Sequence, residues 1–367
     1  MAASSLDLRQ QVGQLLLIGF DGTEATAKLR STFASLQPGG IILFARNITS
    51  PRQTWELLVG AQKCIRVPAF RCVDMEGGTV DRLRNVIAPA PAAAEVAASG
   101  NRQLFRLHGK VIGDECRALG FNVDFAPVVD LGLEPSRSVL TTRTASDVPK
   151  KVVAYAREFL RGLKQAGVLG CGKHFPGLGE ANLDTHKELP SIAKPASRLM
   201  KEDLHPYQAL HRQMPFIMVA HAAYPAVTRD KTPASLSKKW MGDILRRRIG
   251  YRGLVLCDDL EIGGVLKAAP IEEAAVETLK AGSDIFMVCH DEEKVWRAYE
   301  DVLAAAERDA RFARLVAAKA ARIVAFKKKA PGMKRHAPAP TQETIDRLRR
   351  ELWELAEEVR LVVAAKD

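Results

Sequence analysis

The chain has 367 residues, of which 47% are hydrophobic and 26% charged, and it carries a formal net charge of +11. This composition is typical of a globular enzyme, with enough apolar residues to fill one large domain or two medium ones. The basic excess permits weak attraction to anionic polymers, but the cations are scattered, without zinc-finger spacing or interleaved aromatic and basic residues. We therefore expect no nucleic-acid partner.

The first ten residues, MAASSLDLRQ, contain no apolar signal segment, and the apolar run over residues 15–20 is far too short to cross a membrane. The six cysteines show no metal-ligand spacing and mostly adjoin apolar runs, as expected for reduced, buried thiols. The sequence thus predicts a cytoplasmic protein that contacts no membrane and uses no metal or cofactor.

Short apolar runs recur at long, fairly regular intervals along the chain. Each run is almost continuously apolar rather than alternating, which is typical of parallel strands covered on both faces. The runs lie at residues 15–20, 39–44, 70–75, 121–132, 167–176, 215–221, 253–259 and 283–290. Because helical periodicity separates most of them, the pattern predicts a (β/α)8 TIM barrel. A doubly wound open sheet is the alternative, but no GxGxxG follows the first strand.

One of the predicted helices covers residues 145–167. Ser146 or Asp147 is its expected N-cap, and a glycine ends it.

The C-terminal part of the chain changes character after residue 326. Residues 327–341 are basic and proline-rich, which predicts a linker between a barrel domain over 1–326 and a helix over 342–367. Apolar residues in this helix step by three and four positions, forming one stripe: Ile345, Leu348, Leu352, Leu355, Val359 and Val362. The stripe predicts docking onto the barrel, so that the protein is a monomer, or alternatively a dimer formed through this helix.

The predicted strands share a polarity, because their C-terminal ends run into ionisable or polar residues. These residues are Arg46, Asn47, Asp74, Glu76, Asp130, Lys173, His174, His221, Asp258, Asp259 and His290. Active sites of barrel enzymes lie at the C-terminal ends of the strands. We therefore expect these side chains to surround one barrel mouth.

The seventh run ends in two adjacent acids, Asp258 and Asp259. Consecutive strand residues point to opposite sides, so only one of the two is expected to face the mouth. A carboxylate there could act as a nucleophile, a base or a metal ligand. Asp259 could alternatively cap a following helix.

The fifth run leads into the segment KHFPGLGEANLDTHKELP, whose prolines and glycines predict a loop. Asp184 lies two residues before His186, where it could orient the imidazole and raise its pKa, favouring a general acid. A metal site is the rival interpretation, but no HExxH spacing occurs, and no GxSxG supports a serine hydrolase.

Several motifs together resemble glycoside hydrolase family 3, and within it the single-barrel bacterial β-N-acetylglucosaminidases. The motifs are PGGIILFARNI, VDMEGGTVDRL, FAPVVDLG, GKHFPGLG, DTH, VAHAAYP, PASLS and GLVLCDDLEIGG, in order from about residue 8 to 325. The resemblance implies a retaining, two-step mechanism in which Asp258 is the nucleophile. It also implies that His186, paired with Asp184, is the acid/base.

The resemblance further implies a set of sugar contacts and a substrate. Asp74, Arg82, Arg143, Lys173 and His174 would bind the sugar, although Arg82 could instead form a structural ion pair with a neighbouring acid. The implied substrate is the terminal N-acetylglucosamine of peptidoglycan-derived fragments. A catalytically degenerate sugar-binding barrel, another β-glycosidase specificity and a phosphorylase remain open. The chain departs from the family pattern at four positions beside the predicted site: Met75, Thr79, Leu178 and Cys257.

Overall fold

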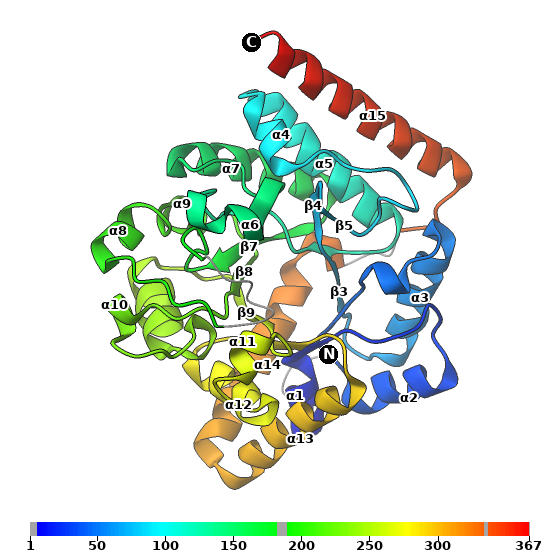
Figure 1. Ribbon diagram of the computed structural model, residues 1–367. Helices are drawn as coiled ribbons and strands as arrows, with labels where there is room; N and C mark the ends of the chain where they lie inside the picture. Colours follow the sequence, from blue (N-terminus) through cyan, green and yellow to red (C-terminus); the bar gives the residue numbers. More distant parts are fainter. Residues whose placement is uncertain (1–5, 182–188, 334–336, 367) are drawn as a thin grey trace.

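In the computed structural model, the eight apolar runs form eight strands that close into one parallel barrel (Figure 1). The structure describes residues 6–181, 189–333 and 337–366. Around the barrel the strands are β1 (Leu16–Ile18), β2 (Gly40–Ile42), β3 (Phe70–Val73), β6 (Val123–Asp124), β7 (Leu169–Phe175), β8 (Phe216–Val219), β9 (Leu254–Asp259) and β10 (Ile285–Val288). The last strand pairs with the first, which confirms the predicted TIM barrel and excludes the open sheet.

Helices surround the barrel and connect its strands (Figure 1). They are α1 (Leu8–Gln14), α2 (Ala27–Leu36), α3 (Pro51–Cys64), α4 (Ala93–Ala98), α5 (Arg102–Ala118), α6 (Arg137–Leu140), α7 (Pro149–Ala166), α8 (Ala196–Lys201), α9 (His205–Leu210), α10 (Pro225–Thr228), α11 (Gly263–Leu266), α12 (Ile271–Ala281), α13 (Glu292–Arg308), α14 (Ala310–Lys329) and α15 (Gln342–Ala364). A π-helical segment, Lys239–Arg248, precedes β9, and a small hairpin of β4 (Met75–Gly77) and β5 (Val80–Asp81) follows β3.

The helix predicted over residues 145–167 is α7, but its N-cap differs from the prediction. Val148 occupies the N-cap without a side-chain hydrogen bond, and Pro149 begins the helix. The Ser146 hydroxyl instead accepts a hydrogen bond from the Val148 amide at 3.1 Å, which ends the preceding loop. Gly167 ends the helix in the left-handed conformation that glycine favours, as predicted.

Helix α14 closes the N-terminal end of the barrel. Phe326 packs edge-on against Phe70 and Phe216, which lie at the first positions of β3 and β8. The next residue, Lys327, is buried and donates hydrogen bonds to Gln14 Oε1 at 2.9 Å and to the Gly39 carbonyl at 2.7 Å. The helix therefore continues to Lys329, and residues 327–329, predicted as the start of the linker, belong to it.

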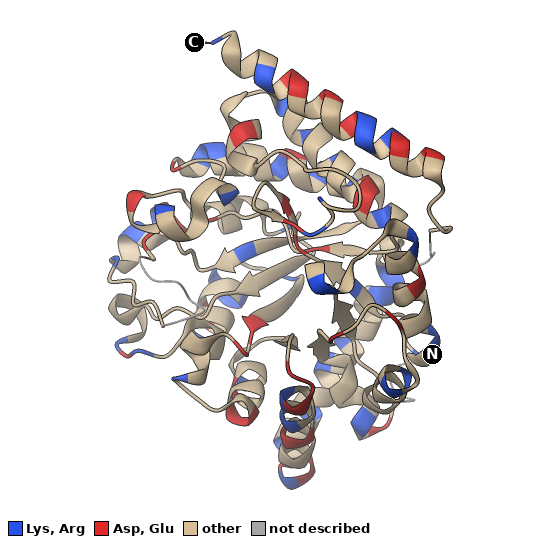
Figure 2. Ribbon diagram, turned by 45° about the vertical axis from the view of Figure 1, so that its right-hand side comes forward, with Lys and Arg blue, Asp and Glu red and all other residues tan. Residues whose placement is uncertain are grey.

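The C-terminal helix α15 lies along α5 and α4 (Figure 1). Five residues of its apolar stripe are buried: Ile345, Leu348, Leu352, Leu355 and Val359. The stripe is therefore covered within the chain, in agreement with docking on the barrel. Basic and acidic residues are interspersed on the remainder of α15 (Figure 2).

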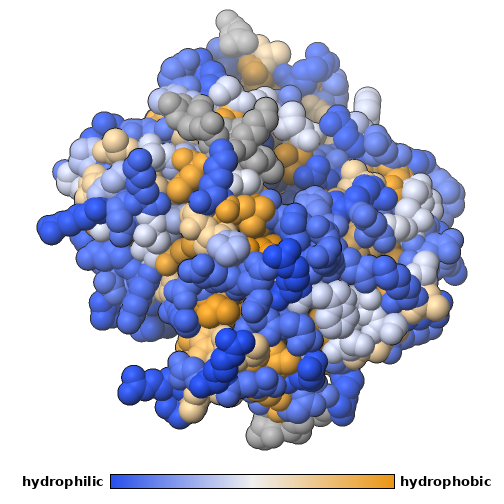
Figure 3. All heavy atoms as spheres, turned by 60° about the horizontal axis from the view of Figure 1, so that its bottom comes forward, coloured by the Kyte–Doolittle hydropathy of each residue, from blue (hydrophilic) through white to orange (hydrophobic). Residues whose placement is uncertain are grey.

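The surface is mainly hydrophilic on the face drawn in Figure 3, with smaller apolar areas between polar side chains. Among the described helices, none is both long enough and apolar enough to cross a membrane.

Candidate active site

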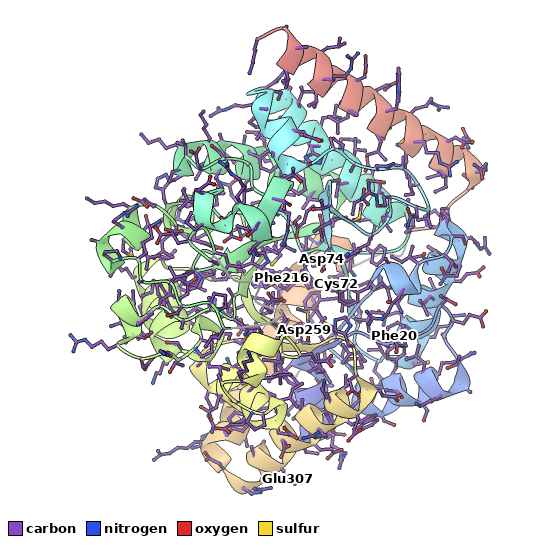
Figure 4. The ribbon with its side chains drawn as sticks, in the orientation of Figure 1. Phe20, Cys72, Asp74, Phe216, Asp259 and Glu307 are labelled. Atoms are coloured by element: carbon purple, nitrogen blue, oxygen red, sulfur yellow. The ribbon has the colours of Figure 1, made fainter. Side chains whose placement is uncertain are left out.

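A cavity of about 540 Å³ lies at the C-terminal ends of the strands, in the volume range of small-molecule sites. Six of the eight predicted site residues line it: Asp74, Arg82, Arg143, Lys173, His174 and Asp258. Figure 4 shows Asp74 and Asp259, from opposite sides of the barrel, near the centre of the mouth. The other two predicted residues, Asp184 and His186, lie outside the described residues.

The end of β9 places two adjacent aspartates at this cavity, which corrects the expectation that only one would face it. Leu256 pairs with Ile285 of β10, and Asp259 pairs with Met287, so three steps on β9 match two on its neighbour. Such a bulge interrupts the alternation of side chains. Both Asp258 and Asp259 therefore line the cavity.

A second irregularity occurs where β7 carries Lys173 and His174. Gly172 pairs with Ile217 of β8, and Phe175 pairs with Val219, again three steps against two. The peptide bond between Lys173 and His174 is cis. Both side chains line the cavity although they are consecutive in the strand.

Four charged side chains form a connected cluster at the cavity wall. The Lys173 ammonium lies 2.7 Å from Asp74 Oδ1 and 2.6 Å from Glu76 Oε1, and Arg143 binds both oxygens of Glu76 at 2.7 and 2.9 Å. Burial disfavours the charge on Lys173, but Asp74 and Glu76 outweigh it and raise the pKa of the ammonium. Burial likewise opposes the charge on Glu76, but Arg143 and Lys173 hold the pKa of its carboxyl well below the ordinary value. Lys173 and Glu76 are thus both charged at neutral pH.

Asp130 holds His174 and the beginning of the following loop. Its Oδ2 lies 2.7 Å from His174 Nδ1 and accepts the His174 amide at 3.1 Å, while its Oδ1 accepts the Leu178 amide at 2.8 Å. The Asp130 side chain is buried. Because these contacts engage Nδ1 on one side of the ring, His174 Nε2 on the opposite side takes no part in them.

Asp258 and Asp259 differ in their electrostatic environments. Asp258 Oδ1 accepts the Asp259 amide at 2.9 Å. Asp259 is more deeply buried, and burial raises the pKa of its carboxyl to about 8, with the charges of Glu261 and Asp258 adding to the effect. Its Oδ1 accepts the Glu261 amide at 3.1 Å, whereas α11 has Ile262 at its N-cap. Asp259 therefore does not cap that helix.

Aromatic and basic side chains form the rim of the cavity. The Arg46 and Arg82 guanidinium carbons lie 4.7 and 5.9 Å from the centroid of the Phe44 ring. Arg46 Nη1 is 3.1 Å from His290 Nδ1, and His290 Nε2 is 3.4 Å from Asp259 Oδ2. Within the described part of the chain, Arg82 Nε has no hydrogen-bond partner, so the alternative of a structural ion pair finds no support there.

A larger cavity of about 1220 Å³ lies at the opposite end, beside the first residues of β7 and β8. No aspartate or glutamate is among its described lining residues. It therefore lacks the carboxylates that the predicted chemistry requires, and we assign the site to the smaller cavity.

The sequence placed Glu76, Asp130 and Asp259 at strand ends but assigned none of them a role in binding the sugar. Each stands at the end of a predicted strand, so its position was visible. What the pattern did not reveal was its partner, because ion pairs such as Glu76 with Arg143 join residues 67 positions apart.

Comparison with known proteins identifies the family. Residues 7–326 match the model of the glycosyl hydrolase family 3 N-terminal domain. The chain belongs to glycosyl hydrolase family 3. A β-hexosaminidase of Alkalilimnicola ehrlichii is 36% identical over 287 residues, covering 76% of this chain and 82% of that protein.

Solved structures of family 3 members show the same architecture. A β-N-acetylglucosaminidase from Paenibacillus sp. superimposes with a TM-score of 0.87 and 33% identity, covering 96% of this chain and 69% of that one. NagZ from Neisseria gonorrhoeae superimposes with a TM-score of 0.71 and 28% identity, covering 85% and 97%. This chain is therefore a family 3 glycoside hydrolase by sequence and by fold.

Proposed function

We propose that this protein is a retaining exo-β-N-acetylglucosaminidase with Asp258 as its nucleophile. The main support is the convergence of Asp258 with Asp74, Arg143, Lys173 and His174 around one cavity at the barrel mouth. The similarity to β-hexosaminidases and to a β-N-acetylglucosaminidase structure supports the same specificity.

In the first step, the Asp258 carboxylate attacks the anomeric carbon, and the bond from that carbon to the aglycone oxygen breaks. His186, oriented by Asp184, gives its proton to the departing oxygen. The sugar is then bound covalently to Asp258. In the second step, His186 takes a proton from water, the resulting oxygen attacks the anomeric carbon, and Asp258 is released as a carboxylate.

The charged cluster is suited to binding a polyhydroxylated ring. Asp74 is an acceptor and Lys173 a donor, and each retains hydrogen-bonding capacity beyond their mutual contact. Arg143 is already engaged with Glu76 through two nitrogens, so its remaining N–H groups are those available to the N-acetyl group or a hydroxyl. His174 offers Nε2, because Asp130 occupies Nδ1.

For the biological substrate, we propose terminal N-acetylglucosamine on peptidoglycan-derived fragments, cleaved in the cytoplasm. This part of the proposal rests on the likeness to NagZ and related β-hexosaminidases.

An aryl β-N-acetylglucosaminide tests the reaction directly. We expect Asp258→Ala to abolish release of the aryl group, and intact-protein mass spectrometry of the acid-quenched enzyme to show a glycosyl adduct that Asp258→Ala lacks. His186→Ala should slow cleavage of poor leaving groups far more than of activated ones. Near wild-type activity in Asp258→Ala would overturn the nucleophile assignment.

Two other outcomes of the same assay would change the function. Binding of N-acetylglucosamine in calorimetry without turnover would indicate a sugar-binding barrel. Formation of the sugar 1-phosphate when phosphate is added would indicate a phosphorylase, in which phosphate replaces water in the second step.

A further inference from the structure

A buried chain of polar side chains lies behind the bulged end of β9. His221 Nδ1 is 2.6 Å from the Ser235 hydroxyl, and His221 Nε2 is 3.0 Å from the Asp259 carbonyl oxygen. Thr278 of α12 donates to the Ser235 carbonyl at 2.8 Å. His221, Ser235 and Thr278 are each at most 1% exposed, and none is among the residues that line the cavity.

The two contacts of His221 determine which ring nitrogen carries the proton. The Asp259 carbonyl oxygen can only accept, so Nε2 must donate to it. Burial lowers the pKa of His221, although the charge of Asp258 and the carbonyls of Asp259 and Asp258 oppose this effect. The ring is therefore neutral at physiological pH, and its bare Nδ1 accepts the Ser235 O–H. The Asp259 carbonyl thus fixes the tautomer, and the Ser235 hydroxyl, which can donate or accept, donates to Nδ1 and orients the ring.

The residue that His221 holds is itself bonded to the proposed nucleophile. The Asp259 amide donates to Asp258 Oδ1 at 2.9 Å, and the Asp259 carbonyl accepts from His221. Because the bulge lies between Leu256 and Asp259, the hydrogen-bond ladder between β9 and β10 is interrupted there. Pairing with β10 therefore does not fix the backbone of every residue in this stretch. His221, two residues after the end of β8, supplies a second constraint on the backbone at this point.

We propose that His221, oriented by Ser235 and donating from Nε2, is a positioning residue that holds the backbone at Asp259 and thereby aims the Asp258 carboxylate at the anomeric carbon. The inference rests on the proposed function, since it assumes that Asp258 is the nucleophile. His221 acts through the backbone and exchanges no proton with the substrate. Its loss should reduce the rate of attack without weakening the binding of the sugar.

The chain offers a graded set of variants. His221→Gln keeps an N–H donor within reach of the position of Nε2, His221→Leu removes it, and Ser235→Ala removes the hydroxyl that orients the ring. His211→Gln is the matched control, because His211 lines the cavity at the opposite end. Each variant is checked by circular dichroism and thermal melting before kinetics.

We expect His221→Leu to lower kcat/KM for the aryl glycoside by about 10- to 100-fold, since small misplacements of reacting groups have effects of this size. The Kd of N-acetylglucosamine should change less than about threefold. His221→Gln should recover most of the loss, Ser235→Ala should show an intermediate loss, and His211→Gln should behave as wild type. A folded His221→Leu variant with unchanged kcat/KM would overturn the proposal.

Nitrogen chemical shifts of ¹⁵N-histidine-labelled protein provide a readout that does not depend on activity or on the stability of His221→Leu. We expect His221 to be neutral with the proton on Nε2 in the wild type, and to keep that tautomer in Ser235→Ala because the Asp259 carbonyl still accepts from Nε2. An Nδ1–H tautomer in the wild type would refute the positioning role. The Asp258→Ala assay distinguishes failure of the proposed function from failure of the positioning role. Activity in Asp258→Ala would refute Asp258 as the nucleophile. An inactive Asp258→Ala together with a fully active His221→Leu would refute only the positioning role of His221.

Discussion

Arg143 and Glu76 form a two-point ion pair in the wall of the cavity at the barrel mouth, with nitrogen-to-oxygen distances of 2.7 and 2.9 Å. Glu76 is 3% exposed, and Lys173 also binds it, so one buried carboxylate is paired with two cations. The geometry of this region therefore depends on Glu76, whose ion-pair partners the sequence did not reveal.

Removing the Glu76 carboxylate should damage both stability and binding. Glu76→Ala leaves buried Lys173 with Asp74 alone and half-buried Arg143 without its paired carboxylate, and breaking a buried pair typically costs about 3–5 kcal/mol. Glu76→Gln keeps the shape and some hydrogen bonds, so it should unfold later than Glu76→Ala in urea and show a raised KM. An unchanged urea midpoint in Glu76→Ala would contradict the assigned ion pairs.

Asp130→Asn should loosen the sugar site without removing any proposed sugar contact. The two carboxylate oxygens accept hydrogen bonds from His174 and Leu178. After the substitution, the side-chain NH2 group would face one of these N–H donors, with which it cannot form a hydrogen bond. We expect KM to rise about tenfold or more, because a hydrogen bond to a charged group contributes about 1.5–3 kcal/mol. Asp147→Asn, at an exposed position, is the control. A wild-type KM in Asp130→Asn would show that this anchoring is unimportant.

The carboxyl of Asp259 should govern part of the alkaline limb of activity. Its pKa of about 8 means that it is protonated at pH 7, and its ionisation above pH 8 would place a second negative charge beside Asp258. We expect kcat/KM to fall in that range, and Asp259→Asn to keep activity at pH 7 while losing this component. The pH profiles of the two proteins, measured side by side, test this. Identical profiles would rule out Asp259 as the titrating group.

Lys327 should make stability depend on pH. Burial lowers the pKa of its ammonium to about 7, whereas in the unfolded chain the ordinary value is near 10.4. Between these values the unfolded chain binds one more proton, so the free energy of unfolding should rise with pH, by up to about 1.4 kcal/mol per pH unit. Lys327→Met should lack this contribution between pH 7.5 and 10 in urea unfolding. The exposed Lys328→Met should keep the wild-type slope, and equal slopes in all three proteins would contradict the prediction.

Helix α15 should stabilise the barrel through its apolar stripe. Leu348 is fully buried, whereas Trp353 on the same helix is 69% exposed. Leu348→Asp places a charge in that apolar contact and should destabilise the protein by about 3 kcal/mol or more, whereas Trp353→Asp should change stability by less than about 0.5 kcal/mol. Thermal melting compares the two. Equal effects would indicate that α15 does not dock as described.

The fold was predictable because its signals are local. Each strand of the barrel is a short apolar run, and each surrounding helix has its own periodicity and often its own cap, as with Ser50 at the start of α3. The polarity of the strands was equally visible, since an ionisable residue follows an apolar run in the sequence itself. These features together were enough to predict that Asp74, Lys173 and Asp258 lie at one end of the barrel.

The partners of these residues could be seen only in three dimensions. Asp258 and Asp259 share the cavity because a bulge against β10 breaks the alternation that strand geometry predicts. His221 looked like one more strand-end residue, yet it is buried behind β9 and holds the Asp259 carbonyl. The sequence by itself therefore determined the barrel and the end that carries the chemistry, because hydrophobic periodicity and strand polarity are local properties. Tertiary structure decided which of those residues line the cavity and which hold the others in place, because register and pairing depend on residues far apart in the chain.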